Sequence, residues 1–317
     1  MLVQFLILAA GLLLILLGAN YLVDGASSVA KKFGLSEFII GVTIVGIGTS
    51  APEMVVSIMS ALQGKADMAI GNVVGSNIFN VFMILGVTAL VAPLAITRSN
   101  LKKDIPLNII VTTLLILLAL NFTIFGVGED KLSRVDGLLM LAIFGWYLWS
   151  SFRSDKNDEE ESSMKTFPMW LSAIMIAGGL AGLIFGGRLF VNSATDIAKS
   201  MGVSDKFIAI TIMAAGTSMP ELATCVVAAL KGRGQLALGN VLGSNIANIL
   251  LILGISSMIT PLSFNGITIV DMGAIFASAL LIFLSAFLFK KKHIDRIEAV
   301  IFLLMEAGYM CYLIANI

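Results

Sequence analysis

The stretch GTSAPE at Gly48–Glu53 returns 168 residues later as GTSMPE at Gly216–Glu221. At the same offset, GNVVGSNIFN at Gly71–Asn80 returns as GNVLGSNIAN at Gly239–Asn248. Between residues 71–94 and 239–262, 13 of 24 positions are identical, without a gap. The chain therefore carries two copies of one unit, and the motifs place Gly and Pro beside Ser, Asn and Glu.

The composition outside these motifs is that of a membrane protein. Of the 317 residues, 58% are hydrophobic and 13% are charged, whereas soluble domains carry about 25% charged residues. Apolar runs long enough to cross a bilayer core of about 30 Å recur along the chain. They predict ten transmembrane helices near residues 2–23, 37–62, 68–93, 104–125, 134–152, 168–190, 206–231, 235–260, 267–289 and 295–316.

The first apolar run has no positive flank and no small-residue cleavage site, so it is expected to be a retained helix rather than a signal peptide. The 20 basic and 20 acidic residues balance, which gives no basic surface for nucleic acid. Two cysteines in apolar runs and one histidine in a basic loop argue against a zinc site and against histidine-based catalysis.

Each copy of the unit holds five predicted spans, an odd number, so the second copy must enter the membrane from the opposite side. The predicted fold class is an all-α membrane protein with ten transmembrane helices in two inverted five-helix repeats, in which helices two, three, seven and eight are broken. The predicted domains are residues 1–152, an acidic linker at 153–167, and residues 168–317. Transporters built this way bind substrate near the midplane, on helices interrupted by Gly or Pro.

Orientation follows from the Lys and Arg residues in the connections, which collect on the cytoplasmic side. One set of connections holds 14 basic residues and the other set holds six. Both termini are therefore expected on the outer side of the cell membrane, and the linker between spans five and six is expected in the cytoplasm. The linker is interpreted as a solvated connection, with a regulatory calcium site on its acidic run Asp158–Glu161 left open as the alternative.

Glu53 and Glu221 fall deep inside predicted spans, where a charged side chain costs about 2.5–3.5 kcal/mol on insertion scales. Oxygen-bearing side chains lie four residues apart on the same helix faces: Thr49 with Glu53, Ser76 with Asn80, Thr217 with Glu221, and Ser244 with Asn248. Carboxylates, hydroxyls and amides without sulfur or imidazole are ligands for hard cations. Calcium takes about six to eight such oxygens, and sodium uses the same type of ligand with less charge. Two glutamates balance one divalent ion or about two monovalent ions.

The prolines and other polar residues of these spans have structural interpretations. Pro52 and Pro220 cannot donate a backbone hydrogen bond, which interrupts each helix and frees a carbonyl. Asn77 and Asn245 lie on another face and are expected to bridge helices. Asn72 and Asn240 are expected to satisfy the backbone of the broken helices, and Asp24 to lie at the interface rather than bind the ion. The role of Glu306 is left open: its side chain either pairs with another helix of the bundle or lines a proton path.

At these motifs the sequence resembles the calcium/cation antiporter superfamily, and within it the prokaryotic sodium/calcium exchangers. The resemblance implies that Thr49, Ser50, Glu53, Ser76 and Asn80 form one half of an ion cluster, and Thr217, Ser218, Glu221, Ser244 and Asn248 the other. It also implies that the backbone carbonyls of Gly46 and Ala214 contribute to sodium sites. Many relatives have Asp at the position of Asn248, so the neutral amide argues against potassium co-transport.

The expected function is secondary antiport of calcium against sodium by alternating access, with spans one and six sliding as a gate. A calcium/proton exchanger using the same glutamates is the alternative, and a cation channel is less favoured. No enzyme activity is expected, because the sequence has no nucleophile–base pair and no phosphate-binding glycine loop. The expected partners are Ca²⁺, Na⁺ and the lipid bilayer, without a cofactor. The oligomeric state is left open, and a monomer is compatible with the pattern.

Overall fold

The computed structural model describes residues 2–120, 130–154, 166–203, 214–264, 266–287 and 292–316, together with residues 123, 126, 208 and 212. These parts are helical except for short connections and two-residue strands, which confirms the all-α prediction. Most of the predicted linker (155–165) and the entry to the predicted seventh span (206–207, 209–211 and 213) lie outside the described residues.

The helices of the first half, in chain order, are interrupted by π-helical segments labelled η. They are α1 (Leu2–Phe33), α2 (Glu37–Ile40), η1 (Gly41–Val45), α3 (Gly46–Thr49), α4 (Ala51–Leu62), α5 (Ala66–Phe79), η2 (Asn80–Leu85), α6 (Gly86–Val91), η3 (Asn100–Asp104), α7 (Ile105–Ala119) and α9 (Arg134–Ser154). Strand β1 (Leu94–Ala95) follows α6, and β2 (Lys131–Leu132) precedes α9.

The second half repeats this order with similar lengths. Its helices are α10 (Met169–Ser200), α12 (Ala214–Thr217), α13 (Met219–Leu230), α14 (Gly234–Ala247), η5 (Asn248–Leu253), α15 (Gly254–Ile259), α16 (Ile269–Ser285) and α17 (Arg296–Ala315). Strand β3 (Leu262–Ser263) follows α15, and β4 (His293–Ile294) precedes α17. The π segments η2 and η5 begin at Asn80 and Asn248, which are equivalent positions of the two motifs.

Six helical segments in the described part of the chain are long and apolar enough to cross a bilayer. They are Leu2–Phe33, Ala66–Val91, Arg134–Arg153, Met169–Ser200, Gly234–Ile259 and Arg296–Ala315. A seventh is the pair Glu37–Thr49 and Ala51–Leu62, bent by 49° at Ser50. The bend lies just before Pro52, whose missing N–H interrupts the helix as the sequence predicted.

Two helices extend further than hydropathy indicated. The first apolar run predicts a helix over 2–23, and α1 continues to Phe33; the sixth predicts 168–190, and α10 continues to Ser200. Hydropathy measures only the apolar part of a helix. The additional turns of α1 and α10 carry polar side chains, which lower the hydropathy but do not interrupt the backbone hydrogen bonds of the helix.

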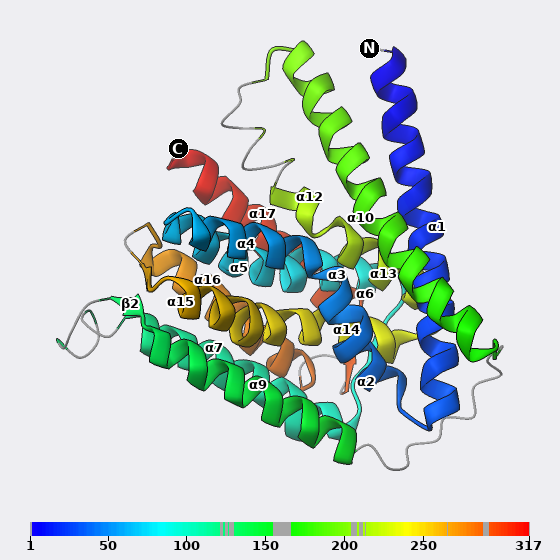
Figure 1. The fold of residues 1–317 in the computed structure, drawn as a ribbon, viewed down its shortest axis with the longest axis horizontal. Helices are drawn as coiled ribbons and strands as arrows, with labels where there is room; N and C mark the ends of the chain where they lie inside the picture. The colour runs from blue at the N-terminus through cyan, green and yellow to red at the C-terminus, as the bar shows by residue number, and fades with distance from the viewer. Residues whose placement is uncertain are drawn as a thin grey trace.

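Helices α1 and α10 run side by side and extend beyond the rest of the bundle (Figure 1). Glycines allow this close packing: a Cβ added to Gly18 would lie 2.7 Å from the Gly179 carbonyl oxygen, and one on Gly186 would lie 2.8 Å from that of Gly11. Small residues at such contacts let two helix backbones approach closely within a membrane. The α1–α10 pair is therefore joined through a smooth seam of backbone rather than through interlocking side chains.

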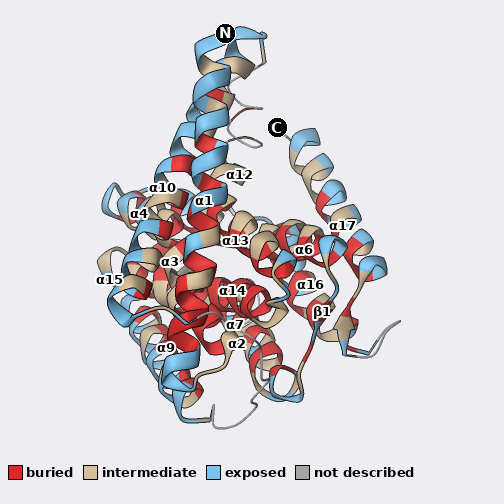
Figure 2. Cartoon of the chain, turned by 90° about the vertical axis from the view of Figure 1, so that its right-hand side faces the viewer, coloured by how far each residue is buried: buried red, intermediate tan, exposed pale blue. Residues whose placement is uncertain are grey.

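The two halves interlock in the remaining bundle. Strand β1 pairs antiparallel with β4, and β2 pairs antiparallel with β3, so each strand pair joins one half to the other. In the same way α17 packs on η2 and α6, and α9 packs on η5 and α15. Helix α14 lies at the centre, coloured as buried in Figure 2, and 94% of the most apolar window of Gly234–Ile259 is enclosed. The motifs therefore meet in the interior, where the two halves face each other.

Candidate cation site

The motif residues lie where regular α-helix is interrupted. Ser50 separates α3 from α4 with ψ 9°, and Ser218 separates α12 from α13 with ψ 8°. Pro52 and Pro220 follow in the first turn of α4 and α13. Each interruption turns the serine and the glutamate after it toward the opposite half.

Each buried glutamate accepts a hydrogen bond from the serine of the other half. The Oγ of Ser50 donates to Oε1 of Glu221 at 3.0 Å, and the Oγ of Ser218 donates to Oε1 of Glu53 at 3.0 Å. Both glutamates are 1% exposed. Thr217 also contacts the carboxylate of Glu53. The two acids are therefore held at one place by reciprocal bonds between the halves.

The asparagines form a second reciprocal set. The Nδ2 of Asn80 donates to Oδ1 of Asn245 at 2.9 Å, and the Nδ2 of Asn248 donates to Oδ1 of Asn77 at 2.9 Å. The Nδ2 atoms of Asn77 and Asn245 donate to each other's backbone carbonyls, at 3.1 and 3.5 Å. Since a carbonyl can only accept, these backbone bonds fix the orientation of every amide in the set. The prediction that Asn77 and Asn245 bridge helices is confirmed.

Four buried oxygen atoms are left without a hydrogen-bond partner by this arrangement: Oε2 of Glu53, Oε2 of Glu221, Oδ1 of Asn80 and Oδ1 of Asn248. A buried polar atom without a partner typically costs about 1–3 kcal/mol. Two carboxylate and two amide oxygens, in matched pairs, are the kind of atoms that a hard cation requires. A bound cation would remove this cost.

The residues that the sequence predicts as ligands are together called the oxygen cluster below, and the contacts of several more of them are defined. The hydroxyl of Thr49 donates to Oδ1 of Asn240 at 3.1 Å, and that of Ser244 donates to the Gly46 carbonyl at 3.2 Å. Ser76 is buried, at 6% exposure. Ala214 begins α12, and its side chain lies outside the description.

Neighbouring polar residues hold this arrangement in place. The Nδ2 of Asn72 donates to the Glu53 carbonyl at 3.1 Å, as expected for an asparagine that satisfies a broken helix. Asn240 differs from that expectation, because it holds the side chain of Thr49 and donates to the sulfur of Cys225. Its place in the repeated motif was the signal that the sequence offered for this supporting role.

Two acids outside the cluster are also placed. Asp24 forms an ion pair with Lys231 at 2.7 Å, and the same ammonium donates to the Asn20 carbonyl at 3.2 Å. Asp24 is therefore partnered by a lysine where α1 meets the end of α13, and its expected place at the membrane interface stays a prediction. Glu306 is 3% exposed on α17, and its Oε2 has no hydrogen-bond partner.

Among the described residues, no group of three or more His, Cys, Asp or Glu side chains is placed to hold a metal ion. The oxygen cluster instead combines two carboxylates with neutral hydroxyl, amide and carbonyl oxygens. Neutral ligands carry no fixed charge, so burying them without an ion costs less free energy than burying further carboxylates. Such ligands therefore suit an ion that is bound and then released. Membrane-length helices around paired, buried acids are typical of membrane ion transporters.

Comparison with known proteins gives the family. The family model described as "Sodium/calcium exchanger protein" matches residues 3–153 and 171–316. The chain is 37% identical to the putative antiporter CaxA of Alkalimonas amylolytica over all of both chains, and 33% identical to the sodium/calcium exchanger MaX1 of Methanosarcina acetivorans over 98% of each. The chain belongs to the sodium/calcium exchanger family, and it is a membrane transporter rather than an enzyme.

Solved structures agree with this assignment. The sodium-calcium exchanger NCX_Mj, soaked without Na⁺ and Ca²⁺, superimposes with a TM-score of 0.84 at 30% identity, covering 98% of this chain and 99% of that one. The same exchanger with Na⁺ and Sr²⁺ gives a TM-score of 0.83 at 32% identity and 98% coverage of both chains. The likeness extends over the entire exchanger.

Proposed function

We propose that this protein exchanges calcium for sodium across the membrane by alternating access at the oxygen cluster. The observation that carries the proposal is the set of four buried, unpartnered oxygens, one carboxylate and one amide oxygen from each half. The names of the similar proteins, which include sodium/calcium exchangers, support the choice of ions. The proposed ligands are the side chains of the oxygen cluster with the carbonyls of Gly46 and Ala214.

Charge explains why such a site exchanges ions instead of leaking. One Ca²⁺ or about two Na⁺ neutralise Glu53 and Glu221 and take up their free oxygens. Without an ion, two carboxylates remain buried, and uncompensated buried charge is strongly unfavourable. We expect this penalty to oppose passage of the empty site across the membrane, so that each half-cycle requires a bound ion.

Our proposed architecture has ten spans in two inverted five-helix repeats, over residues 1–152 and 168–317, joined by a cytoplasmic linker at 153–167. The equivalent interruptions at Ser50 and Ser218, and the equivalent π segments η2 and η5, support it. Both termini would lie outside, in line with the 14 to six distribution of basic residues. A monomer is sufficient for this mechanism, because both halves of the cluster come from one chain.

The proposed gate is the α1–α10 pair, which slides against the other helices. Its glycine seam keeps the two helices together as one body. The ion pair of Asp24 with Lys231 connects α1 to the end of α13, the helix that contains the buried Glu221. This ion pair would have to break or shift when the gate moves.

The hydrogen bonds are compatible with metal cations as the coupling ions. Both glutamates accept bonds from serine hydroxyls through Oε1, and Oε2 of each has no hydrogen-bond partner. A bound cation would satisfy these two oxygens. Protonation of the same glutamates is the alternative, and the transport experiment below distinguishes the two.

The experiment is calcium-45 uptake into liposomes that contain the purified protein. Uptake driven by an outward sodium gradient, unchanged by potassium, is the expected result. Uptake driven by a pH gradient without sodium would assign the proton alternative instead. Calcium flux without any counter-ion gradient would indicate a channel and contradict antiport.

A further inference from the structure

A buried series of hydrogen bonds leads from the oxygen cluster to a cysteine. The hydroxyl of Thr49 donates to Oδ1 of Asn240 at 3.1 Å, and the Nδ2 of Asn240 donates to the sulfur of Cys225 at 3.2 Å. The thiol of Cys225 donates in turn to the Ala237 carbonyl at 3.6 Å. The side chains of this series belong to residues with 0% exposure. The series, called the Thr49 network below, joins α3 of the first half to α13 and α14 of the second.

The first half contains the same arrangement with a hydroxyl in place of the thiol. The Nδ2 of Asn72 donates to the Oγ of Ser57 at 2.9 Å, and that hydroxyl donates to the Ala69 carbonyl at 3.2 Å. These three residues lie 168 positions before their counterparts in the Thr49 network, and Ser57 takes the place of Cys225. The bonding is the same although the atom differs, so this position needs a group that both accepts and donates a hydrogen bond.

The acceptor at Cys225 determines the direction of the bonds in the Thr49 network. A side-chain amide has a donor end and an acceptor end. Because the Nδ2 of Asn240 is directed at the sulfur, its Oδ1 faces Thr49 and receives the hydroxyl proton. A hydroxyl has one proton and two lone pairs, so the lone pairs of Thr49 stay available to a cation.

The opposite orientation of the Asn240 amide would weaken two ligands at once. Without an acceptor at residue 225, the amide would be free to turn over, and its Nδ2 would then occupy a lone pair of Thr49. The proton of Thr49 would go to the Gly46 carbonyl, which lies 3.4 Å from its Oγ1 and is itself a proposed ligand. Groups that orient the ligands of a metal ion typically change its affinity by about 10–100-fold.

We propose that Cys225 is a positioning residue of the cation site: through Asn240 it directs the hydroxyl proton of Thr49 away from the ion, so that Thr49 serves as a ligand. This step rests on the proposed function, because it takes the oxygen cluster as the place where the ion binds. Sulfur is a weaker acceptor than a hydroxyl oxygen. The second half therefore holds its asparagine less firmly than the first half does.

The test is calcium binding to the purified full chain in detergent without sodium, measured by isothermal titration calorimetry. Cys225→Ala removes the acceptor and should raise the dissociation constant for calcium about tenfold. Cys311→Ala, which removes the exposed cysteine of α17, is the control and should leave the constant unchanged. Unfolding temperatures without calcium report any general loss of stability. A dissociation constant that is unchanged in Cys225→Ala would overturn the proposal.

A serine variant separates the hydrogen bond from the packing of the sulfur. Cys225→Ser introduces the hydroxyl that Ser57 supplies in the first half, and it avoids the cavity that alanine leaves. Its affinity for calcium should equal or exceed that of the unmodified protein, because the acceptor is kept. A loss of affinity as large as that of Cys225→Ala would show that packing is responsible, and would overturn the positioning role.

A double-mutant cycle tests the route through Thr49. Thr49→Val removes the hydroxyl and keeps nearly the same volume, so no proton remains for Asn240 to receive. In that background, Cys225→Ala should change the dissociation constant by less than about twofold, the range within which uncoupled errors lie. A further tenfold loss would show that Cys225 acts through other contacts.

Transport keeps this proposal separate from the proposed exchange. In Cys225→Ala the calcium concentration for half-maximal sodium-driven uptake should rise about tenfold, with a smaller change in the maximal rate. The predicted pattern of calcium binding without any sodium-driven uptake would retain the positioning role and contradict exchange. Sodium-driven uptake together with unchanged binding in Cys225→Ala would retain exchange and contradict the positioning role.

Discussion

The two halves of this molecule are alike at the centre and different at the edge. At the centre, Ser50 bonds Glu221 as Ser218 bonds Glu53, and the asparagine bonds are equally reciprocal. At the edge, α1 is joined to α13 by the ion pair of Asp24 with Lys231. The equivalent residues 168 positions away are Asn192 and Gln63, both neutral, so the mirror ion pair cannot form.

A second link exists at the same end of α1. The hydroxyl of Ser28 bonds to the backbone of Phe167, accepts from its N–H at 2.8 Å, and accepts a bond from Ser172 at 2.9 Å. The residue equivalent to Ser28 is Asp196. In the proposed mechanism an ion meets the same ligands from either side of the membrane, which favours a symmetric cluster. The helix contacts around the cluster would then determine which side is closed, and they can therefore differ.

The largest expected effect concerns the symmetric centre. Glu53→Gln and Glu221→Gln should each lower sodium-driven calcium uptake by about 100-fold or more, corresponding to about 3 kcal/mol, because each removes one of two charges that an ion must balance. Asp67→Asn, which removes an acid at the surface, is the control and should retain uptake. Transport by either glutamine variant at the unmodified rate would refute the site.

The next effect concerns the α1–α10 seam. A Cβ on Gly179 would lie 2.7 Å from the backbone nitrogen of Leu22, whereas one on the adjacent Gly178 meets nothing within 4 Å. Gly179→Ala should therefore destabilise the protein by about 1–3 kcal/mol and slow exchange, while Gly178→Ala leaves both unchanged. Thermal unfolding in detergent and calcium uptake measure the difference. Equal behaviour of the two variants would show that the seam is not tightly packed.

The smallest expected effect concerns the asymmetric edge. Lys231→Gln removes the ion pair, whose side chains are 25% and 29% exposed, so the change should be about 0.2–1 kcal/mol. The equilibrium constant between the two positions of the proposed gate should then shift by up to about fivefold, away from the position that the ion pair stabilises. Labelling of single cysteines placed along α1 measures this shift.

The reverse variant tests the same idea from the other half. Gln63→Lys with Asn192→Asp introduces the missing charges, and it should shift the labelling in the opposite direction. If both variants moved the labelling the same way, the ion pair would not determine which side is closed.

Particular residues show how far sequence alone could go. The repeated motifs located Glu53, Glu221, Asn80 and Asn248, and the prolines located the bend before Pro52, because a missing N–H acts locally. Hydropathy located the six helical segments of the described residues that are long and apolar enough to cross a bilayer, but it ended α1 about ten residues early, since it does not register polar turns that continue a helix.

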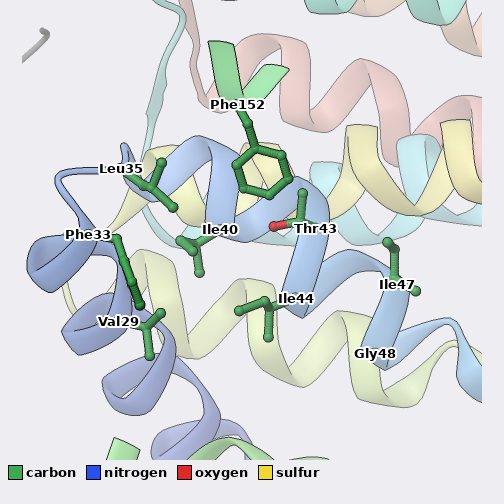
Figure 3. Close-up of a pocket in the computed structure, with 9 residues that line it drawn as sticks. All are labelled: Val29, Phe33, Leu35, Ile40, Thr43, Ile44, Ile47, Gly48 and Phe152. Carbon is green, nitrogen blue, oxygen red and sulfur yellow. The ribbon is translucent and has the colours of Figure 1, made fainter. Parts of the chain in front are cut away.

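The partners of these residues could not be predicted from the sequence. The hydrogen bond from Thr49 to Asn240 joins residues 191 positions apart, and the pairing of Asp24 with Lys231 spans 207 positions. The pocket that Val29 of α1, Ile44 of η1 and Phe152 of α9 help to line likewise depends on three segments that no motif connects (Figure 3). Contacts of this kind depend on how the helices pack, and no local pattern in the chain records them.

The sequence by itself determined the membrane environment, the duplicated unit and the identity of the buried acids. Long apolar runs and repeated motifs are visible directly in the order of the residues. Only the tertiary structure decided that each acid is held by the opposite half, which oxygens remain unpartnered, and that one edge carries an ion pair the other lacks. Those features depend on distances between distant segments, and such distances exist only once the two halves have packed together.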